Sequence, residues 1–333
     1  GRSEPIAEIF QVKGASECGL GAGAVDEECN FEQPIPACED NETLACTSSN
    51  SFAREGLKKG LRLAAELGFN PLRFGFVAAT DTHNGNPGDT EEWDFRGASG
   101  LFNSPAKRRL AAPKGSFKSS IERNPGGLAV IWAEENTREA LFDAMKRRET
   151  YATSGTRIKL RFFAGENLPK DLDKRADAVA TAYNVGTPMG STLPETTTHM
   201  RLYVSALRDP FSAPLQRLQI IKGWLEDGKA METVTDIACG DGFEPVSGRC
   251  PDNGARVDLS NCAYSEETGA AEISLVWEDK KFDPGQTAFY YARVLENPTC
   301  RWSTWDALRT GMQPRDDVPA IIQERAWSSA IWF

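Results

Sequence analysis

Eight cysteines place the strongest constraint on how this 333-residue chain folds, because they fall into two separate groups of four. The first group is Cys18, Cys29, Cys38 and Cys46, and the second is Cys239, Cys250, Cys262 and Cys300. An even number of cysteines in loop-like sequence rich in Gly, Pro, Asp and Asn predicts disulfides and an oxidising compartment, either the periplasm or the cell exterior.

Two other interpretations of the cysteines stay open at this level. Structural zinc prefers two cysteines separated by two to four residues, whereas the tightest gap here runs from Cys38 to Cys46. Reduced thiols in a cytosolic protein are the third possibility. Each group of four allows three pairings, and we favour the local pairs Cys18–Cys29 and Cys239–Cys250.

The charge and hydropathy of the chain exclude two classes of partner. The 38 basic and 48 acidic side chains give a net charge of −10, which argues against a nucleic-acid partner. The longest apolar runs, Phe76–Ala79 and Leu128–Ala133, are far shorter than the ~20 residues of a membrane span. The chain begins with Gly rather than Met, so we expect a processed chain or a fragment.

Residues 1–155 have the pattern of an α/β domain. Nearly continuous apolar sequence predicts strands at 5–12, 73–79 and 127–133, and such strands are typical of a parallel sheet that is covered on both faces. Helical spacing predicts a helix over 51–67, and the capping box Asn136-Thr-Arg-Glu139 predicts a second helix that ends near Arg148. Two connections of about forty residues are long enough to suggest a function or a covalent tie.

Residues 156–333 have an all-β pattern that predicts a sandwich-like second domain. Turn sequences separate six candidate strands, at 157–163, 199–206, 215–222, 233–238, 271–277 and 288–295. The fold class expected for the whole chain is therefore α/β, with a layered or barrel-like first domain followed by a β-rich domain.

Asp81 and His83 are the most chemically suggestive residues, because they follow an apolar strand within the sequence Thr80-Asp-Thr-His-Asn-Gly85. In an extended backbone, side chains two positions apart point the same way. A carboxylate and an imidazole at this spacing can hold zinc, manganese or iron. A hydrogen-bonded structural pair is the equally simple alternative. The other histidine, His199, is interpreted as a surface residue at a strand entry.

Carboxylates and one arginine supply further candidates. Glu8 and Glu17 lie on or just after the first strand, and Glu134 follows the strand that ends in Ala133. Each has a structural alternative, since acidic residues before a helix also stabilise its N-terminus. Arg157 ends the hydroxyl-rich turn after the second helix, where it is a candidate for clamping an anion. A simple turn between a helix and a strand is the alternative.

Several segments, in this order along the chain, resemble the C-terminal half of DUF3604 proteins, relatives of the PHP (polymerase and histidinol phosphatase) metallohydrolases. The segments are Glu8-Ile-Phe-Gln, Ser16-Glu-Cys18, Asp26-Glu-Glu-Cys29, Gly75-Phe-Val-Ala-Ala-Thr-Asp-Thr-His83, Trp132-Ala-Glu-Glu-Asn136, Arg148-Glu-Thr-Tyr-Ala-Thr-Ser-Gly155, Phe289-Tyr-Tyr-Ala-Arg-Val-Leu-Glu296 and Gln323-Glu-Arg-Ala-Trp-Ser-Ser329.

The resemblance implies a distorted TIM-like barrel with a metal centre at the C-terminal ends of its strands. The D-x-H motif that closes PHP-type sites maps onto Asp81 and His83. The opening H-x-H motif has no counterpart here, so the resemblance implies that an N-terminal portion is missing and that the metal site is incomplete. Glu17 and Glu134 are then candidates to orient water or to complete the shell of metal ligands.

From these observations we expect the C-terminal portion of a secreted or periplasmic, metal-dependent hydrolase that acts on a phosphoester or a related small-molecule ester. Arg157 is the candidate that binds an anionic substrate. The competing hypothesis is a non-catalytic extracellular module that binds glycan or protein, with Asp81 and His83 in structural roles. A cleft that holds His83 together with two or more carboxylates would favour the enzyme.

Overall fold

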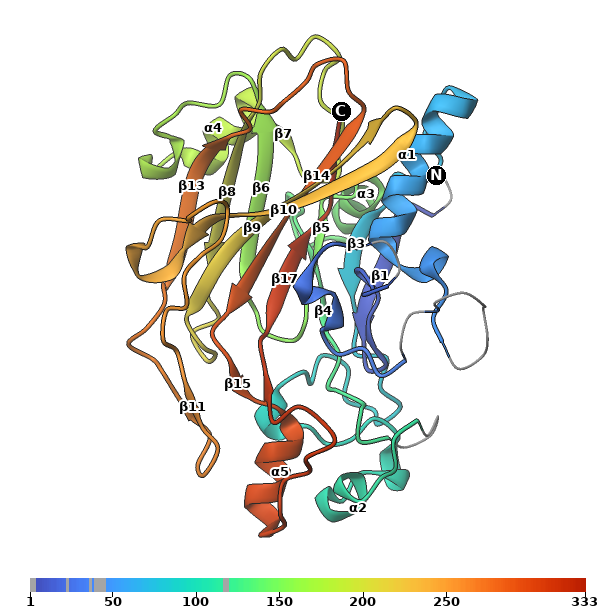
Figure 1. Ribbon diagram of the computed structural model, residues 1–333, viewed down its shortest axis with the longest axis vertical. Helices are drawn as coiled ribbons and strands as arrows, with labels where there is room; N and C mark the ends of the chain where they lie inside the picture. The colour runs from blue at the N-terminus through green and yellow to red at the C-terminus, as the bar shows by residue number, and fades with distance from the viewer. Residues whose placement is uncertain (1–3, 22–23, 36–37, 39–45, 116–119) are drawn as a thin grey trace.

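A large seven-stranded sheet forms the centre of the protein (Figure 1). The computed structural model describes every residue except 1–3, 22–23, 36–37, 39–45 and 116–119. The strands of the large sheet run in the order β10-β9-β14-β17-β5-β4, and β18 also pairs with β14. Their bounds are β4 Leu128–Ile131, β5 Thr150–Thr153, β9 Leu215–Glu226, β10 Lys229–Cys239, β14 Ala288–Glu296, β17 Arg325–Ser328 and β18 Ile331–Trp332.

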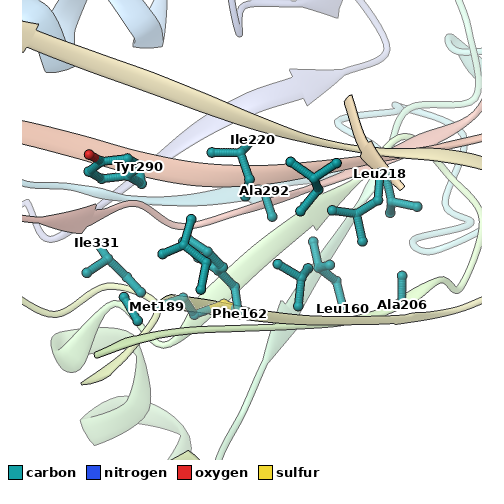
Figure 2. Packing of buried hydrophobic residues seen from close by; sticks show 14 of the residues in the cluster. Leu160, Phe162, Met189, Ala206, Leu218, Ile220, Tyr290, Ala292 and Ile331 are labelled. Atoms are coloured by element: carbon teal, nitrogen blue, oxygen red, sulfur yellow. The ribbon is translucent and has the colours of Figure 1, made fainter. Parts of the chain in front are cut away.

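A four-stranded sheet with the order β13-β8-β6-β7 packs against one face of the large sheet. Its strands are β6 Lys159–Gly165, β7 Thr187–Pro188, β8 Arg201–Leu207 and β13 Glu272–Glu278. Between the two sheets lies an apolar core that includes Leu160 and Phe162 from one sheet and Leu218, Ile220 and Ala292 from the other (Figure 2). Two packed β-sheets are therefore present, but the larger one also includes β4 and β5, which lie before the residues 156–333 to which the predicted sandwich was confined.

The other face of the large sheet is covered by helix α1 (Ala53–Leu67) and a small three-stranded sheet. That sheet has the order β2-β1-β3, with β1 Ile6–Gln11, β2 Gly14–Ala15 and β3 Gly75–Ala78. Leu57 and Leu61 of α1 pack with Phe76 of β3 and with Phe289 and Tyr291 of β14. Every residue of β14 is consequently buried, because its alternate side chains enter two different cores.

The remaining elements are short. The helices are α2 Ala106–Leu110, α3 Arg138–Arg147, α4 Ala178–Val185 and α5 Trp302–Thr310. The 3-10 turns are η1 Glu27–Asn30, η2 Ser49–Ser51, η3 Glu92–Asp94, η4 Gly100–Phe102, η5 Leu172–Lys174 and η6 Gly240–Gly242. Two short ladders join β11 Val257–Asp258 to β12 Ala263–Tyr264, and β15 Thr299–Cys300 to β16 Ile321–Ile322.

The six β-strands predicted after residue 156 are confirmed as β6, β8, β9, β10, β13 and β14, and both predicted helices are confirmed as α1 and α3. The cap of α3 differs from the prediction: Thr137, not Asn136, is the N-cap residue, and its side chain accepts a hydrogen bond from the Ala140 amide. The helix therefore begins one residue later than the capping box indicated.

The parallel sheet expected within residues 1–155 is limited to the pair β1–β3. Strand β4 is antiparallel to β5, and β5 is antiparallel to β17, so both β4 and β5 belong to the same sheet as β9 and β14. One sheet therefore spans the expected boundary between residues 155 and 156. The described residues form mixed α/β structure dominated by sheets, without a closed barrel.

All eight cysteines are paired, as Cys18–Cys29, Cys38–Cys46, Cys239–Cys250 and Cys262–Cys300. Both predicted local pairs are confirmed, and with every thiol oxidised the cysteines offer no zinc site. Four disulfides are typical of proteins that work outside the reducing cytoplasm. In the described part of the chain, no helix has both the length and the apolar character needed to cross a bilayer.

The long connection from β3 to β4 is tied down by helix α5. Phe95, Leu110 and Ile121 of this connection share a core with Trp302 and Ala307 of α5. The Arg109 guanidinium also donates to both carboxylate oxygens of Asp306 on α5, at 2.5 and 2.9 Å. The connection is thus a packed unit, which lies beside α5 at one end of the molecule (Figure 1).

Candidate functional site

Several strand ends meet at one edge of the sheets, which we call the carboxyl edge. The parallel strands β1 and β3 both end there, and the Gly127 amide that precedes β4 donates to the Ala79 carbonyl that follows β3. Leu128 and Ala326 both pair with Thr153, so β4 and β17 begin where β5 ends. The residues that follow β1, β3 and β5 therefore gather at this edge.

Asp81 and His83 lie at the carboxyl edge, directly after β3, and both side chains are exposed. Asp81 has a φ of 48°, in the left-handed region that few residues other than glycine adopt. Gly126 permits the close approach of the backbone here, because a Cβ at that position would lie 2.6 Å from the Thr80 Cα. Aspartate enters this region more readily than most residues, and Asp227 and Asp241 of this chain also adopt it.

Hydrogen bonds of the Asn84 side chain fix the turn that carries Asp81 and His83. The Asn84 side chain donates to the Gly97 carbonyl at 2.7 Å and accepts from the Asn86 amide and the Thr82 hydroxyl at 2.9 and 3.0 Å. The His83 amide donates to the Ala98 carbonyl at 2.6 Å. The backbone of the D-x-H motif is therefore fixed while its two side chains remain accessible.

Arg123 is a residue at this edge that the sequence did not single out. Burial lowers the pKa of its guanidinium, and the nearby negative charge of Asp81 acts in the opposite direction. The bond from the Asn124 amide to the Val12 carbonyl places this part of the connection from β3 to β4 beside the end of β1. No periodicity in the sequence marks this placement.

The donors at the carboxyl edge fit part of a metal site. Asp81 and His83 offer the oxygen and nitrogen that zinc, manganese and iron accept. Within the described ranges, the one group of three or more clustered donors is Cys18, Asp26 and Cys29, and those cysteines form a disulfide. An ion held here would have Asp81 and His83 as two of its ligands, and its remaining coordination positions would need water or a donor outside the described residues.

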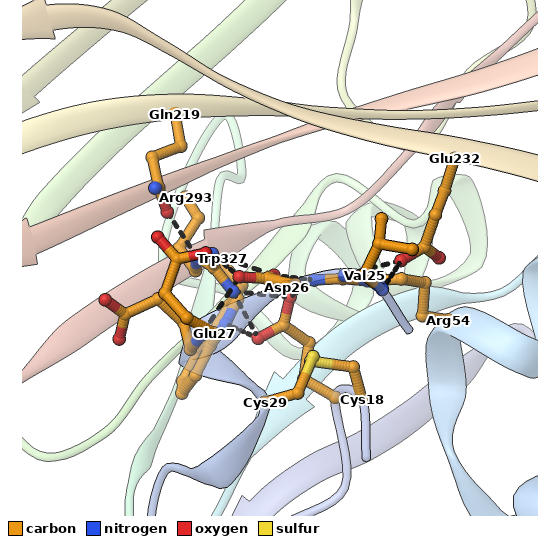
Figure 3. A network of polar contacts seen from close by, with 12 residues as sticks. Cys18, Val25, Asp26, Glu27, Cys29, Arg54, Gln219, Glu232, Arg293 and Trp327 are labelled. Atoms are coloured by element: carbon orange, nitrogen blue, oxygen red, sulfur yellow. Dashed lines mark hydrogen bonds and ion pairs between the residues drawn. A yellow bond between two sulfur atoms is a disulfide. The ribbon is translucent and has the colours of Figure 1, made fainter. Parts of the chain in front are cut away.

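Glu17 lies in the interior. It bonds to a network of polar side chains that includes Arg54, Arg293 and Trp327 (Figure 3). Its Oε1 accepts hydrogen bonds from Arg54 and Tyr291, each at 2.6 Å. Its Oε2 accepts from Trp327 at 2.6 Å and from Arg293 at 3.1 Å. Because both oxygens are occupied by buried donors, this carboxylate acts as the anchor of a network in the structure.

Asp26 is the second acid of this network and accepts from the same two arginines, Arg54 at 2.8 Å and Arg293 at 2.9 Å. Burial alone would raise the pKa of Glu17 and of Asp26, but the charges of Arg293 and Arg54 outweigh it, so both carboxyl groups have lowered pKa values. The Cys18–Cys29 disulfide closes the loop that carries Asp26 (Figure 3).

Glu134 is exposed and lies beyond the opposite end of β4. Strand β4 starts at the carboxyl edge with Leu128 and runs away from it, since Ile131 pairs with Thr150 at the start of β5. The structure therefore separates Glu134 from Asp81 and His83. Neither Glu17 nor Glu134 is brought to the D-x-H motif.

Arg157 lines a cavity of about 490 Å³ near the end of β5. Its Nη1 donates to Glu91 Oε1 at 2.6 Å, and its backbone amide donates to Asp209 Oδ2 at 2.8 Å. The predicted cationic residue is therefore present in a cavity, although an acid already pairs with it. The described lining residues are Thr90, Glu91, Glu92, Trp93, Gly155, Thr156, Arg157, Asp209, Phe211, Ser212, Tyr264, Thr299, Cys300, Trp305 and Glu324.

Two buried acids of this cavity, Glu92 and Glu324, were missed from the sequence. Burial raises the pKa of Glu324 to about 8, and burial together with the charge of Glu324 raises the pKa of Glu92 well above its usual value. Glu296 lies behind Ser212, which donates to it, and burial raises its pKa to about 8 as well. Perturbed acids in a cavity are typical of functional sites. No local sequence pattern predicts these buried acids, because their burial depends on segments that are distant in sequence.

Comparison with protein-family models matched residues 1–333 to the family described as protein of unknown function (DUF3604). Comparison with curated proteins gave no match. Comparison with solved structures gave none either.

Proposed function

Because this chain belongs to the DUF3604 family, we propose that it is part of a metal-dependent hydrolase of the PHP type, in which Asp81 and His83 are metal ligands. The proposed substrate is a phosphoester or a related ester. The proposed fold relation is that β1, β3 and the strands beside them correspond to part of a distorted TIM-like barrel. The proposed location is the periplasm or the cell exterior, in keeping with the four disulfides.

The observation that supports the proposal most is the position of the D-x-H motif. Asp81 and His83 are exposed where the parallel strands β1 and β3 end, the place where sites form in parallel α/β folds. Asp81 holds a left-handed backbone conformation there. The Asn84 side chain fixes the turn through bonds to Gly97, Asn86 and Thr82. These bonds would hold the two proposed ligands in place before a metal binds.

A divalent ion held at this motif would lower the pKa of a bound water and neutralise charge on the attacked ester. Asp81 and His83 would supply two of its ligands. Arg157 is the proposed residue to receive an anionic substrate, with its guanidinium paired to Glu91 in the absence of ligand. Arg123, on which the charge of Asp81 acts, is a second candidate at the carboxyl edge.

The alternative function, a binding module without catalysis, is favoured by a different observation. Aromatic side chains surround the cavity that holds Arg157, and two of them, Trp93 and Phe211, are 50% and 88% exposed. Exposed aromatic clusters mark interaction sites more often than chance would give. This alternative predicts ligand binding in the cavity without any requirement for metal at Asp81 and His83.

The test of the hydrolase proposal is a comparison of metal binding and hydrolysis in matched variants. We expect the chain to bind zinc or manganese, and the double variant Asp81→Ala, His83→Ala to lose at least about tenfold in affinity, because two ligands are removed. The measurement is metal content by plasma mass spectrometry after equilibration and desalting. Hydrolysis of bis(4-nitrophenyl) phosphate, with and without a chelator, reports activity.

The control variant is His199→Ala, which removes the other histidine of the chain. His199 is 49% exposed on its side chain, and its Nδ1 lies 3.2 Å from Glu166 Oε1, away from the carboxyl edge. This variant should bind metal like the parent protein. Unchanged metal content in the Asp81, His83 double variant would refute the assignment.

A further inference from the structure

The cavity at the ends of β5 and β17 has aromatic walls assembled from four separate segments. Trp93 comes from η3, Phe211 from the connection between β8 and β9, Tyr264 from β12 and Trp305 from α5. One ring already carries a cation, since the Arg309 guanidinium lies 5.4 Å from the centre of Trp305. Trp93, Phe211 and Tyr264 therefore supply the other aromatic rings that line the cavity.

Acids greatly outnumber bases in the lining of this cavity. The described lining residues include Glu91, Glu92, Asp209 and Glu324, against the single basic side chain of Arg157. Arg157 is neutralised by Glu91, at 2.6 Å. Above about pH 8, where Glu324 is ionised, a negatively charged ligand would meet these acids, and the one basic side chain among the described lining residues is already paired. The cavity therefore disfavours anions under these conditions.

The two innermost acids are held in place but lack a positive partner of their own. Glu92 Oε2 accepts from the Trp302 amide at the start of α5, and Glu324 accepts from the Ser154 hydroxyl. Arg301, whose positive charge acts on Glu92, is engaged by Glu32 at 2.8 and 3.0 Å. Behind the cavity wall, Oε1 of the fully buried Glu296 makes no hydrogen bond within the described part of the chain.

We propose that this cavity binds a small organic cation of the quaternary ammonium class, with the Trp93, Phe211 and Tyr264 rings around the cationic group and Glu324 as its counter-ion. The electron-rich faces of aromatic rings attract such cations strongly when water is excluded. A quaternary ammonium group has no N–H to donate, so rings and a carboxylate satisfy it completely. This binding activity is separate from the proposed hydrolysis, and it requires no metal ion.

A saccharide is the other ligand that aromatic walls suit, but the polar groups favour a cation. Recognition of a sugar needs side chains that are free to exchange hydrogen bonds with hydroxyl groups. Here Arg157 is engaged by Glu91, and the two oxygens of Asp209 accept from the Arg157 and Phe211 amides at 2.8 and 3.0 Å. What these pairs leave without a partner, above about pH 8 where Glu324 is ionised, is mainly negative charge. Among the described lining residues, Thr156 Oγ1 is the one buried hydroxyl that makes no hydrogen bond.

The experiment compares choline with 3,3-dimethylbutan-1-ol, which has the same shape but no charge. Binding to the 333-residue chain is followed by titration calorimetry and tryptophan fluorescence at about pH 9, in the presence of a metal chelator. We expect choline to bind at least about tenfold more tightly than the neutral alcohol. Equal binding of the two compounds, absence of choline binding, or binding of glucose and maltose but not choline would each overturn the proposal.

Two variants locate the binding. Trp93→Ala, at a half-exposed position, and Glu324→Gln should each weaken choline binding by about tenfold. The control Phe102→Ala removes a 62% exposed ring on η4, outside the cavity, and should bind like the parent chain. Thermal unfolding checks that each variant is folded, and Trp93→Ala keeps the test decisive if Glu324→Gln unfolds. Normal binding in Trp93→Ala would contradict the assignment.

The pH dependence gives an independent readout. The groups that act on the Glu324 carboxyl are Ser154, Glu296, Glu32, Glu92 and Arg325, and its pKa is about 8 because burial dominates their sum. A proton and a cation compete for this carboxylate, so choline affinity should rise as the pH increases from about 7 to about 9. The Glu324→Gln variant should lose most of that dependence. A flat profile in the parent chain would show that Glu324 is not the counter-ion.

Discussion

Replacing Glu17 by glutamine is expected to lower the free energy of unfolding by about 3–5 kcal/mol, because it removes one partner from a buried network of charges. The Glu17 carboxylate accepts from Arg54, Tyr291, Arg293 and Trp327, and both arginines are fully buried. Without this charge, Arg293 keeps Asp26 as its close acidic partner, and Arg54 keeps Asp26 and the more distant Glu232. Urea denaturation followed by tryptophan fluorescence measures the change.

The matched control is Glu27→Gln, ten residues further along the chain. Glu27 pairs with Arg249 at 2.7 Å, but the two side chains are 54% and 44% exposed. Exposed pairs of this kind contribute about 0–1 kcal/mol. If both variants change the free energy of unfolding by the same small amount, the network around Glu17 is not the stabilising element that its burial indicates.

The same variant bears on the prediction that Glu17 takes part in catalysis. A structural anchor should lose stability first, and any loss of activity should follow the loss of folded protein. A catalytic carboxylate should lose activity at temperatures where the variant is still fully folded. Measuring hydrolysis and unfolding on one preparation of Glu17→Gln therefore separates the two roles.

Raising the pH from about 5 to about 8 is expected to destabilise the protein by at least about 2 kcal/mol. Glu296 and Glu324 have folded-state pKa values of about 8, raised mainly by burial, against 4.5 for an ordinary glutamate. Between these values the folded state holds protons that the unfolded state has released. Stability is therefore greatest below about pH 4.5 for these two groups, and it falls as the pH rises through about 8.

The measurement is the urea midpoint as a function of pH in the parent chain and in the double variant Glu296→Gln, Glu324→Gln. An amide cannot ionise, so the variant should show a flatter profile above about pH 5. Unchanged slopes in the two proteins would show that these carboxyl groups do not titrate as the structure indicates.

A second process limits stability on the acid side. The lowered pKa values of Glu17, Asp26 and Glu28 mean that their contribution is fully present above their ordinary pKa range and is lost as the pH falls below it. Ionisation of Glu296 and Glu324 and protonation of Glu17, Asp26 and Glu28 therefore destabilise the protein in different pH ranges. The Glu296, Glu324 double variant should lose stability at low pH in the same way as the parent chain.

Local patterns predicted the strands and helices well because those patterns depend on near neighbours in sequence. The alternation of apolar residues located β6, β8, β9, β10, β13 and β14, and helical spacing located α1 and α3. What these patterns left undetermined was how the strands pair. Strand β4 was expected in a parallel sheet, yet it joins the antiparallel sheet through β5 and β17.

Helix α1 shows why the buried network could not be predicted. Arg54 and Lys58 are charged residues that any periodicity argument assigns to solvent, yet both are buried. They are buried because Glu232, on β10, reaches them at 3.4 and 2.9 Å across 178 and 174 residues of sequence. A charged side chain is buried at low cost only when an oppositely charged side chain pairs with it. Here the partner is distant in sequence, so a local pattern cannot identify it.

The sequence by itself determined the spacing of the strands, the two local disulfides, the family and the D-x-H motif at the end of an apolar strand. Each of these depends on residues close together along the chain. Only the tertiary structure decided that Glu17 is a buried anchor, that Glu134 lies far from His83, and that Glu92 and Glu324 share an aromatic cavity. Those outcomes depend on contacts such as the bond from Trp327 to Glu17, which spans 310 residues, and burial and charge pairing are set by such distant contacts.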